Sequence, residues 1–260
     1  MTFEIDLAGR RALVTGAGQG VGLSIALSLA DAGAEVVVND VVADKAEAAA
    51  DAICSAGGRS TPLSFDVTDW DAVRAAVEGS GAVDILVNNA GNAGIEGFTG
   101  MLDFVETEPA DWDRFFGVNL FGVMHCTRAA LPAMVDAGWG RVVTIISDAS
   151  RRGEAKLAPY AAAKAGAAGF CRAVAREVGR HAITVNCVSL GNIATPGTGP
   201  PPPDTPEAVE RERNFLRPYV IRRRGQPDDA AGLVTYLASP LAEWITGQTY
   251  AVNGGYTFST

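Results

Sequence analysis

The chain has 260 residues, of which 48% are hydrophobic, and this composition excludes a disordered protein. The length and apolar content suffice for one large hydrophobic core, and α/β domains often reach this size as a single unit. With 21 Lys and Arg residues against 30 Asp and Glu residues, the formal net charge is -9. Such a surface repels nucleic-acid phosphates, so we expect a small-molecule substrate and no nucleic-acid partner.

The sequence also indicates a cytoplasmic location. Residues 1–11 carry several charges and no long apolar run, so they do not resemble a signal peptide. No apolar stretch approaches the roughly 20 residues that cross a bilayer, so we expect no membrane association. We expect the four cysteines to be buried as small hydrophobes in a reducing compartment, and we expect no metal site. They are Cys54, Cys126, Cys171 and Cys187.

Short β-branched segments alternate with Ala-rich segments from the N-terminus onward. The expected strands are Ala12–Thr15, Glu35–Asn39, Pro62–Phe65, Asp84–Val87, Val142–Ile146, Thr184–Val188 and Thr249–Val252. Helices are expected at Val21–Ala32 and Ala43–Ala56, and Thr68 or Asp69 can cap the helix after the third strand. Continuous apolar strands separated by helices are typical of a doubly wound parallel sheet covered on both faces. We therefore predict a single α/β domain over residues 1–260, with ligands at the carboxyl ends of the strands.

A glycine-rich turn follows the first expected strand. Gly16, Gly20 and Gly22 give the spacing G-x-x-x-G-x-G, whereas Val21 prevents a G-x-G-x-x-G match from Gly16. Such glycines let the backbone approach a pyrophosphate, which the N-terminus of the next helix attracts. An ordinary turn would also explain the glycines, but the strand before and the helix after favour a nucleotide site. The expected cofactor residues here are Gly16, Gln19, Gly20, Val21 and Gly22.

The ends of the next strands supply further cofactor candidates. Asp40 can accept hydrogen bonds from the adenosine ribose and would repel a 2′-phosphate, and no basic residue stands at Gln19 or Asn39, so the sequence favours NAD over NADP. Asp66 and Val67 could bind the adenine edge. Turn chemistry at strand ends would also explain these residues, and Asn88 in particular fits a structural role. The expected cofactor residues at these strand ends are Asp40, Val41, Asp66, Val67, Asn88, Ala90 and Gly91.

Three further residues form a candidate catalytic group. Tyr160 and Lys164 are four residues apart on an Ala-rich helix and so share one face, and Ser147 ends the fifth strand. Alcohol oxidation needs a base for the hydroxyl proton, and a free tyrosine, with a pKa near 10, is a poor base at neutral pH. A nearby ammonium and a positively charged nicotinamide would lower that pKa, and Ser147 could donate a hydrogen bond to the substrate oxygen.

These motifs together resemble those of the short-chain dehydrogenase/reductase family, from about Leu7 to Gly255. The resemblance rests on the glycine turn, Asn88-Asn89-Ala90-Gly91, Ser147 and Tyr160-x-x-x-Lys164. It implies a Rossmann fold with strand order 3-2-1-4-5-6-7, a homotetramer or homodimer built on helix pairs, and Asn119 as a fourth catalytic residue. It also implies that Gly191, Ile193 and Thr195 contact the cofactor, although Leu190 replaces the family's usual proline before Gly191.

The substrate site is expected to be apolar. Its candidate residues are Ser147, Ala149, Tyr160, Leu190 and Phe215, together with Ala93, Ile95 and Tyr219. Residues 192–224 include the proline-rich segment Thr195–Pro206 and an expected helix at Glu207–Leu216, and we interpret them as a substrate lid, with a surface linker as the alternative. Arg151, Arg152 and Arg222–Arg224 could hold coenzyme A phosphates, as in family members that act on hydroxyacyl thioesters, or could be solvated surface charges.

The combined interpretation is an NAD-dependent oxidoreductase acting on a secondary alcohol or ketone with a hydrophobic body, such as a hydroxyacyl-CoA or 3-oxoacyl thioester. Two other functions stay open at this point. The chain could be a non-redox lyase or isomerase of the same fold, or a nucleotide-binding regulator. The complete set of Ser147, Tyr160, Lys164 and Asn119 argues against a regulator.

Overall fold

The computed structural model describes residues 4–92, 102–195 and 205–258. Its centre is an all-parallel sheet of seven strands in the order β3-β2-β1-β4-β5-β6-β7, which confirms the expected topology. The strands are β1 (Arg11–Val14), β2 (Glu35–Asp40), β3 (Arg59–Ser64), β4 (Ile85–Asn88), β5 (Gly140–Ser147), β6 (Ile183–Leu190) and β7 (Thr249–Val252). Because the order reverses between β1 and β4, a crevice for ligands is expected at the carboxyl ends of these strands.

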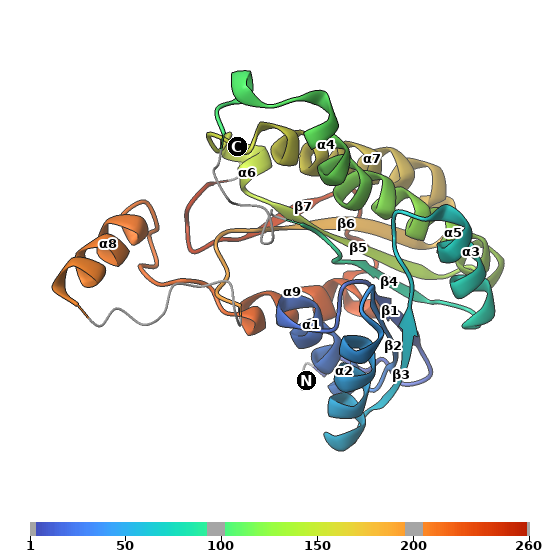
Figure 1. Ribbon diagram of the computed structural model, residues 1–260. Helices are drawn as coiled ribbons and strands as arrows, with labels where there is room; N and C mark the ends of the chain where they lie inside the picture. The colour runs from blue at the N-terminus through green and yellow to red at the C-terminus, as the bar shows by residue number, and fades with distance from the viewer. Residues whose placement is uncertain (1–3, 93–101, 196–204, 259–260) are drawn as a thin grey trace.

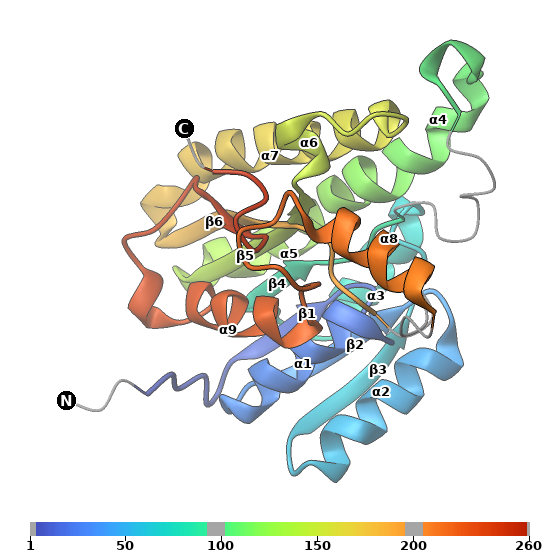
Figure 2. The same ribbon diagram turned by 90° about the vertical axis from the view of Figure 1, so that its left-hand side faces the viewer.

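Helices cover both faces of the sheet, as Figures 1 and 2 show. One face packs against α1 (Gly20–Asp31), α2 (Ala43–Ser55) and α9 (Pro227–Leu237), and the other packs against α3 (Trp70–Gly79), α5 (Gly122–Ala137) and α7 (Ala158–Val178). The remaining helices are α4 (Pro109–Phe116), α6 (Ala149–Arg152) and α8 (Pro206–Leu216), with short helical turns η1 (Phe104–Glu106), η2 (Gly117–Phe121), η3 (Gly179–His181) and η4 (Pro240–Ala242).

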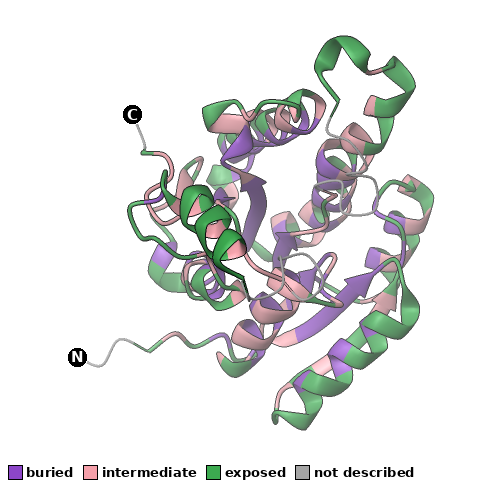
Figure 3. Cartoon of the chain, turned by 60° about the vertical axis from the view of Figure 1, so that its left-hand side comes forward, coloured by how far each residue is buried: buried purple, intermediate pink, exposed green. Residues whose placement is uncertain are grey.

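The core explains why the strands are so apolar. Every residue of β4 and β6 is buried, and β5 is buried up to Ile146, because helices cover both sides of these central strands (Figure 3). β3 lies at the edge of the sheet, and its residues are partly or fully exposed. The apolar sequences of the central strands therefore reflect a sheet that is covered on both faces.

Some local expectations are confirmed and others are wrong. Asp69 caps α3, its carboxylate accepting hydrogen bonds from two backbone amides of the first turn. Cys126, Cys171 and Cys187 are buried, but Cys54 is exposed, because it lies near the end of α2 and faces away from the core. Pro206 was expected to lie outside a helix but begins α8, at a position where the missing amide hydrogen costs nothing. Residues 196–204 of the proline-rich segment lie outside the described residues.

Helix α8 extends away from the body of the domain in Figure 1, and it has no buried residue. It leads into the segment that returns to α9, so it borders the carboxyl ends of β6 and β7. Among the described residues, no helix is both long and apolar enough to cross a membrane.

Candidate active site

The glycine turn after β1 forms a cradle that side chains would fill. A Cβ atom on Gly16 would lie 2.8 Å from the Ala90 Cα, closer than packing allows, and both Gly16 and Gly20 have positive φ angles. Gln19, the residue before α1, provides no side-chain cap, so the first amides of that helix point into the crevice without a side-chain acceptor. An open cradle beside an uncapped helix N-terminus fits the pyrophosphate of a dinucleotide.

Segments distant in sequence meet at this cradle. A Cβ atom on Gly20 would lie 3.1 Å from the Thr195 Cγ2, so the residues after β6 approach the glycine turn. Ile193 pairs with Gly225 in an isolated parallel bridge, which holds the same segment beside the residues that precede α9. The structure thus brings Thr195 next to the glycine turn, and its contact with the cofactor stays a prediction.

Asp40 ends β2 next to the same cradle and is nearly buried. Its carboxylate accepts hydrogen bonds from the Gly18 amide, at 3.2 Å, and the Val42 amide, at 3.0 Å. A side chain at Gly18 would collide with this carboxylate, so the glycine lets Asp40 approach the turn. Val41 is exposed at the rim of the site.

Two asparagines shape the glycine turn, and sequence analysis did not assign them this role. The Asn89 side-chain amide donates to the carbonyl oxygens of Thr15, at 3.0 Å, and Gly16, at 2.9 Å. The Asn39 Oδ1 accepts from the Gly16 amide at 3.3 Å, and its amide donates to the carbonyl of Phe65 at 3.0 Å. The Asn-Asn pair at 88–89 was the only signal for Asn89, while nothing in the sequence distinguished Asn39 from a strand residue.

Three other cofactor candidates are engaged elsewhere. Asn88 is buried and donates to the Thr127 hydroxyl at 3.1 Å, which supports a structural role between β4 and α5. The exposed Asp66 accepts from both the amide and the hydroxyl of Thr68, so it stabilises a turn. The carbonyl of the buried Val67 lies 3.0 Å from the His125 Nδ1. These hydrogen bonds do not indicate that any of the three residues contacts the ribose or the adenine of a cofactor.

The catalytic serine and tyrosine face each other from the end of β5 and the start of α7. The Ser147 Oγ accepts a hydrogen bond from the Ala149 amide at 3.2 Å. Tyr160 is buried, and its ring makes an edge-to-face contact with Phe115 at a centroid distance of 6.4 Å. Burial raises the pKa of Tyr160, and a hydrogen bond with Ser147 acts in the opposite direction. Without bound cofactor, the predicted ionisation at neutral pH is therefore not favoured.

Lys164 lies one helical turn beyond Tyr160 and is also buried. Its ammonium donates to the Ile145 carbonyl at 2.9 Å, so the lysine holds α7 against β5. Burial lowers the pKa of Lys164 to about 8, with a smaller opposite effect from Cys187. The sequence predicted that this ammonium and a bound nicotinamide together would favour the phenolate, and this stays a prediction, since burial is the largest effect on the pKa of Tyr160 within the protein itself.

Asn119 completes the group from the π-helical turn η2, a kind of helix irregularity that is common at functional sites. Its amide donates to the Asn92 Oδ1 at 2.7 Å and to the Phe115 carbonyl at 3.0 Å. Its buried Oδ1 has no partner among the described residues. A Cβ atom on Gly91 would lie 3.0 Å from this oxygen and 3.2 Å from the Lys164 Nζ, so the glycine leaves both atoms accessible.

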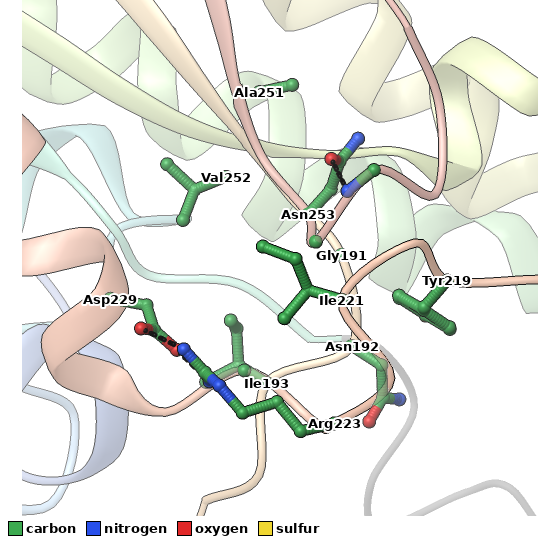
Figure 4. Close-up of a pocket in the computed structure, with 13 residues that line it drawn as sticks. Gly191, Asn192, Ile193, Tyr219, Ile221, Arg223, Asp229, Ala251, Val252 and Asn253 are labelled. Atoms are coloured by element: carbon green, nitrogen blue, oxygen red, sulfur yellow. Dashed lines mark hydrogen bonds and ion pairs between the residues drawn. The ribbon is translucent and has the colours of Figure 1, made fainter. Parts of the chain in front are cut away.

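A cavity of about 360 Å³ lies at the ends of β6 and β7 (Figure 4). Gly191, Ile193, Tyr219 and Ile221 are among its lining residues, whereas Ser147 and Tyr160 are not. A side chain at Gly191 would come within 3.0 Å of the Asn253 Cα, so this loop is packed tightly against the residue after β7.

The substrate candidates divide into two groups. Ser147 and Leu190 are register partners on adjacent strands, and Ala149 begins α6, so these residues surround the strand ends near Tyr160. Phe215 lies on α8, where its ring contacts Tyr219 at a centroid distance of 6.1 Å. Its place in the substrate site stays a prediction. Ala93 and Ile95 lie outside the described residues.

The arginines proposed for coenzyme A phosphates have partners within the chain. Arg223 makes a two-pronged ion pair with Asp229 at 2.6 and 2.7 Å (Figure 4). Arg224 binds both carboxylate oxygens of Glu212 at 2.8 Å. Arg152 stacks on the Tyr256 ring. These contacts favour structural roles for the three arginines over phosphate binding.

Comparisons with known proteins agree with this geometry. A family model described as Enoyl-(Acyl carrier protein) reductase matches residues 16–257. The chain is 37% identical to 7alpha-hydroxysteroid dehydrogenase of Escherichia coli (strain K12), over 97% of this chain and 96% of that protein. A solved 7 alpha-hydroxysteroid dehydrogenase complexed with NADH and 7-oxo glycochenodeoxycholic acid has 36% identity and a TM-score of 0.87, covering 98% of both chains. A gluconate 5-dehydrogenase from Burkholderia cenocepacia J2315 in complex with NADP and tartrate has 33% identity and a TM-score of 0.86, also covering 98% of both.

The cofactor cradle, the Ser147–Tyr160–Lys164 arrangement and these matches over nearly the whole length identify the class. The chain belongs to the short-chain dehydrogenase/reductase family. It is an oxidoreductase that uses a nicotinamide cofactor to interconvert an alcohol and a ketone. The comparisons do not support a lyase, an isomerase or a regulator.

Proposed function

We propose that the chain is an NAD-dependent dehydrogenase. The observation that carries this choice is Asp40, whose carboxylate is fixed at the end of β2 by the Gly18 and Val42 amides. A fixed carboxylate can accept hydrogen bonds from ribose hydroxyls, whereas a 2′-phosphate about 4 Å away would cost on the order of 4 kcal/mol near a protein surface. Lys45 lies in the first turn of α2, is exposed, and has no ion pair with Asp40 among the described residues.

The catalytic residues have distinct roles in the proposed mechanism. A bound nicotinamide would supply the hydride acceptor and, in its oxidised form, positive charge next to the phenol. The Tyr160 hydroxyl, as phenolate, takes the alcohol proton, and it returns a proton in the reverse direction. The Ser147 hydroxyl donates to the substrate oxygen. Lys164 would hold the ribose of the cofactor, and its positive charge lowers the free energy of the phenolate.

Proton supply to Tyr160 needs a route from solvent. We propose that one water molecule links the unpartnered Asn119 Oδ1 to the Lys164 Nζ on the open side of Gly91. Two polar partners and a missing side chain support a water at this place. Asn92 positions the asparagine by accepting its amide hydrogen, so that the oxygen remains available to the water.

The substrate that we propose is a secondary alcohol, or the matching ketone, with a hydrophobic body. Phe115, Ala149, Leu190 and Tyr219 supply apolar surface around the strand ends. The thioester possibility stays a prediction, because Arg223 and Arg224 are bound to Asp229 and Glu212.

A panel of alcohols tests the proposed function directly. Cyclohexanol, decahydro-2-naphthol, a 7α-hydroxysteroid, gluconate and 3-hydroxybutyryl-CoA would each be incubated with NAD or NADP, and NADH or NADPH formation would be followed by absorbance. We expect turnover with NAD and an apolar ring alcohol. Preference for NADP, or turnover confined to gluconate, would contradict the proposal.

We also propose that the chain is a cytoplasmic homotetramer or homodimer. Phe121, at the end of η2, and Met124, three residues later in the first turn of α5, are both exposed, which supports pairing of this helix with that of a second copy. Light scattering coupled to gel filtration would measure the mass, and a purely monomeric chain would contradict this assembly.

A further inference from the structure

A buried carboxylate follows the catalytic serine and is not part of the mechanism above. Asp148 is 2% exposed and accepts hydrogen bonds on both oxygens. The Ser189 hydroxyl donates to its Oδ1 at 2.6 Å, while the Thr257 hydroxyl, at 2.8 Å, and the Asn253 amide donate to its Oδ2. Asp148 therefore joins the end of β5 to β6 and to the residues that follow β7.

The three hydrogen-bond donors to Asp148 are neutral, and its ion-pair partner among the described residues is Arg151, whose Nη1 lies 3.6 Å from the Asp148 Oδ1. These contacts compensate the buried charge, but well-packed apolar residues in place of a buried ion pair are often equally or more stabilising. The polar contacts of Asp148 therefore point to a role besides stability, in fixing the segments that it joins.

The segment that Asp148 holds is the C-terminal one, residues 253–258, which we call the C-terminal clasp. The Asn253 amide also donates to the Thr257 carbonyl at 2.9 Å, and its Oδ1 accepts from the Gly255 amide at 2.9 Å. Gly254 and Gly255 both have positive φ angles, which allow the chain to fold back sharply here. As a result Phe258 lies beside α6, where its carbonyl accepts a hydrogen bond from Arg151 at 3.3 Å.

The clasp presents Tyr256 to two segments next to the active site. The Tyr256 hydroxyl donates to the Glu154 Oε2 at 2.9 Å, just after α6. Its ring stacks on Tyr219 with a centroid distance of 4.6 Å and an interplanar angle of 22°. The Arg152 guanidinium lies 4.3 Å from the centroid of the same ring.

Through Tyr219 the clasp reaches the base of helix α8. The Tyr219 amide donates to the Leu216 carbonyl at the end of α8, and the Ile221 amide donates to the Gly254 carbonyl at 2.8 Å. The ring of Tyr219 also contacts Phe215 on α8. The path from Ser147 to α8 therefore runs through Asp148, the clasp and Tyr219, and each step is a hydrogen bond or a ring contact.

We propose that Asp148 is a positioning residue and that the clasp it anchors determines substrate size, because Tyr256 fixes the base of α8 relative to Ser147. This inference rests on the proposed function. The clasp touches the residues after the catalytic serine on one side and the expected lid on the other. A large substrate reaches the lid, so its binding depends on the distance between the base of α8 and Ser147. A small alcohol contacts only Ser147 and Tyr160.

The main test removes the charge of Asp148. Asp148→Asn leaves the shape of the side chain but removes the charge and one acceptor. Exchanging Asn253 as well is not a rescue, because its amide also donates to the Thr257 carbonyl, which an aspartate could not do. The probes are cyclohexanol and the largest ring alcohol that the wild-type chain oxidises. We expect Asp148→Asn to raise KM for the large alcohol about tenfold to 100-fold and to change kcat and KM for cyclohexanol little.

Two further variants separate positioning from stability. Tyr256→Ala leaves Asp148 intact and is expected to raise KM for the large alcohol selectively. Asn186→Ala is the matched control, because Asn186 is a buried amide that ties β6 to the Ile245 carbonyl and the Gln248 amide, away from the strand ends. It should lower the melting temperature without a selective change in KM.

The outcomes distinguish the two proposals. If the wild-type chain oxidises none of the alcohols, the proposed function fails before the clasp is tested. If it is active, equal losses on both alcohols in Asp148→Asn or an unchanged KM ratio in Tyr256→Ala would each overturn the inference. NADH affinity, measured by fluorescence, should stay at the wild-type value in all these variants.

Discussion

The side-chain oxygen of Asn119 and the ammonium nitrogen of Lys164 lie against the same open side of Gly91. A Cβ atom at that glycine would be 3.0 Å from the oxygen and 3.2 Å from the nitrogen. The oxygen is buried and unpartnered among the described residues, and the ammonium has donated only one of its hydrogens, to the Ile145 carbonyl. This pairing supports a water-linked path between α7 and the π-helical turn, two elements that the sequence separates by about 40 residues.

Gly91→Ala should therefore impair catalysis more than folding. The added methyl group would occupy the space that we assign to the linking water, and we expect kcat to fall about tenfold to 100-fold because proton transfer is slowed. Gly79→Ala is the matched control, since no atom lies within 4 Å of its Cβ position and it needs no unusual φ angle. Steady-state kinetics with thermal unfolding would compare the two, and equal kcat values in both variants would argue against the water path.

Oxidation and reduction should respond to pH in opposite directions. Burial raises the pKa of Tyr160, so the phenol holds its proton at neutral pH and the base form increases only as the pH rises. We expect kcat/KM for the alcohol to increase between pH 6 and 8, while kcat/KM for the ketone, which needs the protonated phenol, stays level or falls. Rates in both directions, measured in one set of buffers, check this. An oxidation rate that falls steadily with pH over this range would contradict it.

Lys164 predicts a pH effect on stability. Its pKa in the folded chain is about 8, below the ordinary 10.5, mainly because it is buried. Between these values the unfolded chain binds more protons than the folded one, so this residue makes unfolding less favourable as the pH rises from about 8. Lys164→Met removes this contribution. Denaturant unfolding of both proteins would be measured at pH 7.5 and 9.5. The unfolding free energy of the wild type minus that of Lys164→Met should be larger at pH 9.5, and the same difference at both pH values would contradict this prediction.

Asp40→Ala should reduce the preference for NAD over NADP. Without the carboxylate, a 2′-phosphate no longer meets a fixed negative charge, and the ribose hydroxyls lose an acceptor. We expect the ratio of kcat/KM for NAD to that for NADP to fall at least about tenfold. Asp66→Ala serves as a control, because its carboxylate bonds only to Thr68 among the described residues. An unchanged ratio in Asp40→Ala would remove the main support for NAD.

Local sequence patterns predicted the fold and much of the site. Strands such as Val142–Ile146 are apolar because helices cover both faces of the sheet, and the glycine motif lies within a single turn. Both features are therefore visible in a short stretch of sequence. The roles of Asn89 and Asp148 could not be predicted in this way, because their partners come from elements far away in the sequence. The burial of Tyr160, which raises its pKa, could not be predicted either, because the spacing to Lys164 indicates a nearby charge but not how the surrounding elements cover the phenol.

The most direct test of the mechanism is the turnover of Tyr160→Phe on the best ring alcohol, with NADH affinity measured in the same preparation. Phenylalanine keeps the ring contact with Phe115 and removes only the hydroxyl that accepts the proton. The mechanism predicts that kcat falls by about 10²–10⁴-fold while the NADH dissociation constant stays near that of the wild type. A variant that binds NADH and turns over at the wild-type rate would contradict the assignment of Tyr160 as the catalytic acid and base.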